Sequence, residues 1–150
     1  MSYLHEKEVI HQDLKPANII VEDGSRKPII CDFGVSKLKD LAVTNMAGSN
    51  AGTLGYQHIE QLHGEKATTA VDVYSFGVIT GEVYSRQPAW TGKTFVEVKK
   101  AIEKEEYPTF PRIPQEYKDL MAKCFKPAKQ RATFMELLPD LESLSKIDVW

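Results

Sequence analysis

The chain has 150 residues, of which 42% are hydrophobic and 27% are charged, a composition that suits one globular domain with its own core. Its 19 basic and 21 acidic residues give a formal net charge of −2, which excludes a general attraction to nucleic acid or anionic lipid. Two cysteines make no disulfide framework, and no apolar run is long enough to span a bilayer. We therefore expect a cytoplasmic protein with no membrane span and no nucleic-acid partner.

The first third of the chain predicts the end of a helix, a pair of strands and a loop. Residues 1–8 read as the last turns of a helix, because apolar side chains stand there and no capping residue precedes them. Short apolar runs at residues 19–21 and 28–31 flank an Asp-Gly turn signal, which predicts a small β-hairpin. Residues 32–56 are rich in small and polar residues without a period, which predicts a long loop.

The remainder of the chain predicts helices. Apolar side chains cover nearly every side of residues 70–85, as expected for a buried central helix, and Asp72 inside it needs hydrogen-bond partners. Thr133 and Glu136 form a capping-box pattern at the start of the last helix. Three prolines stiffen the connection at 107–114. The three further helices are expected at residues 94–105, 115–124 and 133–144.

Two motifs carry the chemistry. The stretch from His11 to Asn18, His-Gln-Asp-Leu-Lys-Pro-Ala-Asn, has an Asp with an Asn five residues later, as in the catalytic loop of protein kinases. Asp32-Phe33-Gly34 follows directly after the second predicted strand. Either motif alone could arise by chance, but chance does not explain both in this order around a hairpin. The whole chain resembles a protein kinase.

The resemblance continues through the rest of the sequence. It includes Gly52-Thr53-Leu54-Gly55-Tyr56, the stretch Asp-Val-Tyr-Ser-Phe-Gly-Val from Asp72, and Arg131. These stretches are similar to those of the tyrosine-kinase-like group of serine/threonine kinases. It implies a mainly α fold, the C-terminal lobe of a kinase with a small β-hairpin at the active site and without the N-terminal lobe. Residues 1–144 would form this partial kinase domain and residues 145–150 a C-terminal tail.

By this resemblance, four residues carry phosphoryl transfer from ATP. Asp13 would accept the proton of the incoming hydroxyl group and orient it. Lys15 would neutralise charge on the phosphoryl group. Asn18 and Asp32 offer the oxygen ligands that Mg²⁺ prefers. The implied cofactors are therefore ATP and Mg²⁺, bound in part by these same residues.

The resemblance also implies contacts to nucleotide and substrate. Ile20 would form part of the adenine floor, and Cys31 would line the site just before the metal ligand. Serine/threonine members of the family carry a lysine at the position of Lys15. Thr53 in the substrate-side loop would bond the catalytic Asp and this lysine, which favours serine or threonine in the protein substrate.

Five further residues are expected to be structural. By the resemblance, His11 would pack against Phe33, and Asp72 would hold the backbone of the catalytic loop. Glu60 and Arg131 would form a buried ion pair, and removing one partner of such a pair typically costs about 3–5 kcal/mol.

Two residues depart from the family pattern. Gln12 replaces the arginine that commonly receives a phosphate group, so we expect activity to depend little on phosphorylation of Thr44, Ser49 or Thr53. His58 begins a His-Ile-Glu stretch where the family has Ala-Pro-Glu, and the lost proline predicts a looser substrate-side loop.

The sequence lacks the Gly-rich loop, the strand lysine and the hinge of a kinase. Met1 stands where the family often has an internal methionine or leucine, so we expect an incomplete chain whose partner is a missing N-terminal lobe or upstream domain. Such a fragment would catalyse little alone, because positioning supplies most of the rate. Two hypotheses stay open: a serine/threonine kinase fragment acting on a protein substrate, and a non-catalytic, kinase-like docking module.

Overall fold

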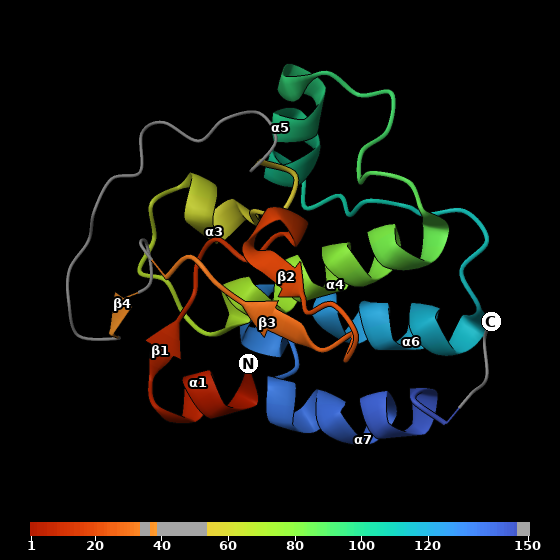
Figure 1. Cartoon of the computed structure of the whole chain (residues 1–150). Coiled ribbons are helices and arrows are strands. Elements are labelled where there is room, and N and C mark those ends of the chain that lie inside the picture. Colours follow the sequence, from red (N-terminus) through yellow and green to blue (C-terminus); the bar gives the residue numbers. More distant parts are fainter. Residues whose placement is uncertain (34–36, 39–53, 147–150) are drawn as a thin grey trace.

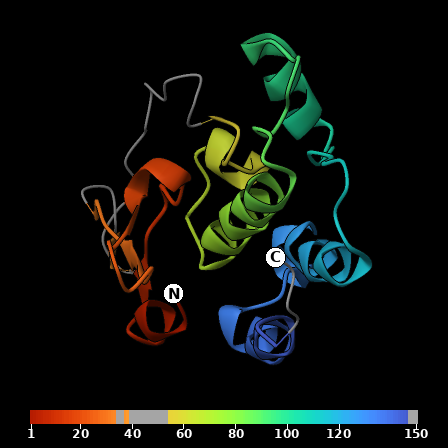
Figure 2. The same ribbon diagram turned by 45° about the vertical axis from the view of Figure 1, so that its right-hand side comes forward.

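The structure is a computed structural model, and it describes residues 1–33, 37–38 and 54–146. Figure 2 shows helix α4 (Ala70–Ser85) running between the strands on one side and helices α6 (Gln115–Cys124) and α7 (Phe134–Leu144) on the other. The described part of the chain is mainly helical, as predicted. No helix in these ranges is long and apolar enough to cross a membrane.

Two antiparallel strand pairs lie near the N-terminus (Figure 1). Residues 19–21 pair with residues 28–30, and Ile20 lies opposite Ile29. This pair of strands is the β-hairpin that the sequence predicts, and a short 3₁₀ helix, η1 (Pro16–Asn18), precedes its first strand. The other pair was not predicted, because strands of two residues show no period, and its second strand falls within the loop expected over 32–56. The elements of this region are α1 (Ser2–Glu6), β1 (Val9–Ile10), η1 (Pro16–Asn18), β2 (Ile19–Val21), β3 (Pro28–Ile30) and β4 (Lys37–Leu38), with β2 pairing β3 and β1 pairing β4.

The helices follow the predicted ranges closely. The N-termini of α5 and α7 are closed by capping boxes, in which a threonine side chain accepts from the backbone of a glutamate three residues on. The sequence did not predict α3 because it has a single turn. The helices are α3 (Ile59–Leu62), α4 (Ala70–Ser85), α5 (Phe95–Glu103), α6 (Gln115–Cys124) and α7 (Phe134–Leu144), with a 3₁₀ turn η2 (Ala128–Gln130) before α7.

Helix α4 provides the centre of the core, where its side chains meet those of α6 and α7. Val73 is buried in one cluster with Leu120 and Cys124 of α6 and with Phe134 and Leu137 of α7. The expectation of burial on every side is wrong for the last turn. The side chain of Val83 there is 59% exposed.

Gly77 on α4 lies where α4 packs tightly against the end of α6. A β-carbon there would lie 2.6 Å from Cβ of Cys124 and 2.9 Å from Cε1 of Phe125. Because Cβ of Cys124 is fixed to its backbone, α6 must move away in Gly77→Ala, and we expect a loss of about 1–3 kcal/mol of unfolding free energy. Urea unfolding followed by circular dichroism measures it. Val83→Ala is the exposed control on the same helix, and a Gly77→Ala chain as stable as this control would contradict the expectation.

Candidate active site

The loop between β1 and β2 brings together three of the four residues that the sequence predicts for phosphoryl transfer. The Lys15 ammonium lies 2.8 Å from Oδ2 of Asp13. Asn18 donates from Nδ2 to the same Oδ2 at 3.1 Å and to the Asp13 backbone carbonyl at 2.8 Å. The Asn18 side chain is buried, whereas the side chains of Asp13 and Lys15 are 18% and 22% exposed. The Asp13 carboxylate is therefore held by a cation and an amide and still reaches solvent.

The hairpin connects Asp32 to this loop through the backbone. The amide of Cys31 donates to the carbonyl of Asn18 at 2.9 Å, which continues the β2–β3 pairing by one step. Asp32 follows immediately, with an exposed side chain and a φ of 61° in the left-handed region. Asp adopts this region more readily than most non-glycine residues, though it is still uncommon. Asp32 thus lies at the same end of the hairpin as Asn18.

His11 joins the same two segments and contacts Phe33, as expected. Its Nε2 lies 3.0 Å from the carbonyl oxygen of Cys31, and its ring centroid lies 5.1 Å from that of Phe33. The His11 side chain is fully buried. Its contacts tie the loop before Asp13 to the residues that precede and follow Asp32.

Asp72 on α4 anchors the backbone of the loop. Its carboxylate is fully buried and accepts from the amide of His11 at Oδ2 and from the amide of Gln12 at Oδ1, both at 2.8 Å. The expectation that Asp72 needs hydrogen-bond partners is therefore confirmed. A third partner was missed: Nε2 of His5 on α1 also contacts Oδ2 at 2.8 Å. No local pattern could have revealed it, because 67 residues separate the two side chains.

Ile20, which is assigned to nucleotide contact, is one of several exposed apolar side chains of the hairpin region. Ile20 on β2 is 55% exposed, and Phe33 is 43% exposed. Val21 and Ile29 of the same hairpin are also exposed, while Cys31 is partly buried. Exposed apolar side chains this close together suit a surface that another body covers.

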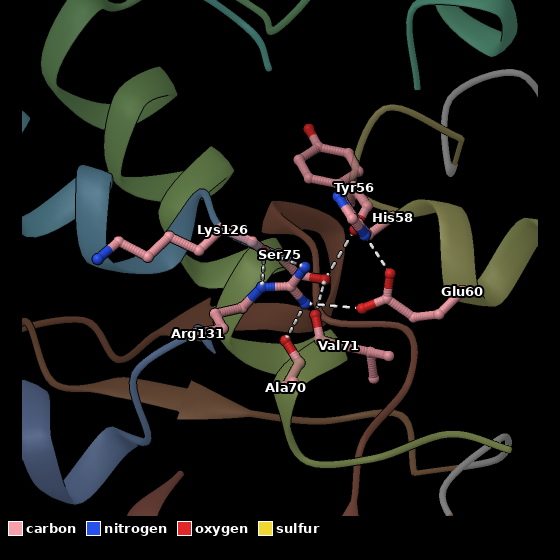
Figure 3. Close-up of polar contacts among 8 residues, drawn as sticks. All are labelled: Tyr56, His58, Glu60, Ala70, Val71, Ser75, Lys126 and Arg131. Carbon is pink, nitrogen blue, oxygen red and sulfur yellow. Dashed lines mark hydrogen bonds and ion pairs between the residues drawn. The ribbon is translucent and has the colours of Figure 1, made fainter. Parts of the chain in front are cut away.

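Glu60 and Arg131 form the expected buried ion pair (Figure 3). Nη1 of Arg131 lies 2.8 Å from Oε1 of Glu60 and donates to the Ala70 carbonyl. Its Nε and Nη2 donate to the carbonyl of Lys126 at 3.0 and 2.8 Å. The guanidinium group therefore joins α3, the start of α4 and the turn after α6 in one network.

His58 adds a contact that the sequence did not reveal. Its Nδ1 contacts Oε2 of Glu60, and its ring packs against Tyr74 and stacks on Tyr107 (Figure 3 shows the first contact). Burial alone would raise the pKa of Glu60, but the hydrogen bond to His58 and the charge of Arg131 outweigh it and lower the pKa to about 2. Glu60 is therefore held as an anion.

The described end of the predicted substrate-side loop is fastened to α4. Tyr56 donates from its hydroxyl to Oε2 of Glu82 at 2.7 Å, and Ser75 donates to the Tyr56 carbonyl at 2.8 Å. Trp90 donates from its indole nitrogen to the carbonyl of Gly55 at 3.3 Å. Thr44, Ser49 and Thr53 lie outside the described residues.

Comparison with known proteins supports the same family. The pattern described as "Protein kinase domain" matches residues 1–140. A probable LIM domain-containing serine/threonine-protein kinase of Dictyostelium discoideum is 33% identical over 149 residues, and the probable serine/threonine-protein kinase SIS8 of Arabidopsis thaliana is 33% identical over 153. Each match covers 97% of this chain but only 22% and 14% of those relatives. Mitogen-activated protein kinase kinase kinase 7 of Drosophila melanogaster is 29% identical over 92% of the chain and 20% of its own length. The chain belongs to the protein kinase family.

Proposed function

We propose that this chain carries the phosphoryl-transfer residues of a serine/threonine protein kinase, with Asp13 as the base. The observation that carries the proposal is the meeting of Lys15 and Asn18 on one oxygen of the Asp13 carboxylate. Neither contact uses Oδ1 of Asp13, which leaves that oxygen to accept the proton of a substrate hydroxyl. Lys15 stands beside it as the cation that neutralises phosphoryl charge.

The residues present also fit a magnesium ion. Because the Asn18 amide nitrogen faces Asp13, its oxygen is the atom left to ligate a cation. The Asp32 carboxylate is exposed at the same end of the hairpin, one residue beyond the Cys31–Asn18 backbone bond. An amide and a carboxylate oxygen are ligands that Mg²⁺ prefers. When bound with ATP, the ion would neutralise charge on the phosphate groups.

The remainder of the nucleotide site is proposed to lie in residues outside these 150. Ile20 and Phe33 would then face a nucleotide-binding lobe, which accounts for their exposure, and Cys31 would line the site beside Asp32. Lys15 supports serine or threonine as the acceptor, and the relatives from Dictyostelium discoideum and Arabidopsis thaliana are named serine/threonine-protein kinases. Without that lobe, we propose that the chain transfers phosphate poorly, because half of the positioning groups are absent.

Phosphotransfer from labelled ATP by the protein in its full encoded length tests the proposal. In Asp13→Asn, we expect kcat to fall by roughly 10²–10⁴-fold, because the base is lost while the shape of the side chain stays. Asp23→Asn, in the exposed β2–β3 turn, is the matched control and retains activity. Full activity in Asp13→Asn would refute the assignment. No phosphotransfer and no thermal stabilisation by Mg-ATP in the wild type would favour the docking module instead.

A further inference from the structure

The peptide bond between Gln12 and Asp13 is held at both of its polar groups. The Gln12 carbonyl accepts a hydrogen bond from Nε2 of Gln61 on α3 at 3.0 Å. The Asp13 amide donates to Nδ1 of His11 at 3.3 Å. Because a peptide unit is planar, holding its carbonyl and its N–H together fixes the rotation of the whole unit. That rotation sets the direction in which the Asp13 side chain leaves the backbone.

The backbone at Gln12 needs such support. Its φ of 68° lies in the left-handed region, which residues other than glycine rarely adopt. The Gln12 amide is held by Asp72 of α4 at 2.8 Å, on the side of the residue away from Asp13. Gln61 provides the hold on the carbonyl side. An uncommon backbone conformation persists only where its surroundings fix it, and here α4 and α3 each supply one contact.

Gln61 makes this contact as a donor. Its Oε1 is buried and accepts no hydrogen bond from any described residue, so the Gln12 carbonyl is the partner that the structure shows for its amide group. Leaving a buried acceptor unpaired is unfavourable, and the donated bond offsets that cost. Gln61 also follows Glu60, which Arg131 holds against the turn after α6. The Gln61 side chain therefore extends from helix α3, whose position the Glu60–Arg131 ion pair fixes.

We propose that Gln61 is a positioning residue, which fixes the Gln12–Asp13 peptide and thereby couples helix α3 to the orientation of the Asp13 carboxylate. The catalytic role of Gln61 rests on the proposed function. The hydrogen bonds that hold the Gln12–Asp13 peptide, here called the peptide clamp, are independent of any activity. Gln61 does not touch the reacting atoms, so its loss acts through Asp13. The turnover number is the kinetic parameter that it controls, and ATP affinity is left unchanged.

Gln61→Glu tests the clamp directly, because it keeps the size of the side chain and replaces the donor with an acceptor that repels the Gln12 carbonyl. Gln130→Glu makes the same chemical change at an exposed position and is the matched control. In the 150-residue chain, we expect amide hydrogen exchange at Asp13 to become about tenfold faster in Gln61→Glu, while amides of α6 and α7 keep their rates. Gln61→Met, which removes the donor without repulsion, gives an intermediate increase.

Kinetics of the full-length protein supply the second readout. We expect kcat of Gln61→Glu to fall by about ten- to a hundredfold with KM for ATP unchanged, because a misplaced base slows the chemical step. If the amide hydrogen-exchange rate of Asp13 is the same in Gln61→Glu as in the wild type, Gln61 does not hold the Gln12–Asp13 peptide. Equal acceleration at Asp13 and throughout α6 and α7 overturns the positioning role, since it shows general destabilisation. A wild-type protein that lacks phosphotransfer refutes the proposed function, and the exchange experiment still decides the clamp.

Discussion

Asp72→Ala is expected to lower the free energy of unfolding by about 3–5 kcal/mol, because more than one buried donor loses its acceptor and each unpaired donor costs about 1–3 kcal/mol. The carboxylate is fully buried and accepts from the amides of His11 and Gln12 and from Nε2 of His5. Without it, the His11 amide is left in the core without its acceptor and the Gln12 amide loses its own. Urea unfolding followed by circular dichroism measures the loss.

Two further variants make this result specific to Asp72. Asp72→Asn keeps one carbonyl acceptor, so its unfolding free energy is expected to lie between those of the wild type and Asp72→Ala. Asp119→Ala removes a carboxylate from the exposed side of α6 and is expected to change stability by no more than about 0.5 kcal/mol. If Asp72→Ala unfolded at the same urea concentration as Asp119→Ala, the anchoring role of Asp72 would be wrong.

Arg131→Met is expected to destabilise the fold by a similar amount, about 3–5 kcal/mol, because it leaves the Glu60 carboxylate buried without its cation. It also removes the donors to the carbonyls of Ala70 and Lys126. Combining Arg131→Met with Glu60→Gln removes both charges. The double variant is therefore expected to lose less than the sum of the two single losses, as measured by a double-mutant cycle in urea. A strictly additive cycle would show that the two side chains do not stabilise one another.

The same ion pair predicts a dependence of stability on pH. The pKa of Glu60 is lowered from 4.5 to about 2, so its stabilising contribution is complete above about pH 4.5 and is lost as the pH falls toward 2. The difference in unfolding free energy between the wild type and Glu60→Gln is therefore expected to shrink between pH 5 and pH 3. Other acidic groups, such as Glu97 and Glu136, are present in both chains and cancel in this difference. A difference that stays constant over this range would contradict the shift.

Long periodic segments allowed the helices to be predicted from the sequence alone. The expected range 115–124 coincides with α6, and the capping-box pattern of Thr133 and Glu136 placed the start of α7. Strands β1 and β4 and helix α3 were missed because two to four residues give no measurable period. The fold was thus predictable wherever burial repeats along the chain.

The candidate site was predictable as far as its motifs extend. Asp13, Lys15 and Asn18 lie within one short motif, and the structure brings them into contact. The contacts of His5 with Asp72 and of Gln61 with the Gln12 carbonyl join residues 67 and 49 positions apart. Such pairings depend on how α1 and α3 pack against the catalytic loop, which no local pattern encodes. The predicted role of Thr53 remains a prediction.

We propose that Asp13, Asn18 and Asp32 face one divalent cation, and the proposed kinase function depends on this arrangement. Nuclear magnetic resonance of the 150-residue chain, titrated with Mn²⁺, tests it directly, because Mn²⁺ takes the same oxygen ligands as Mg²⁺ and broadens the signals of nearby residues. We expect the signals of these three residues to broaden first and Asp32→Asn to weaken the effect. Broadening that spares them, or that centres on exposed carboxylates such as Glu22 and Asp23 and persists in Asp32→Asn, would contradict the claim.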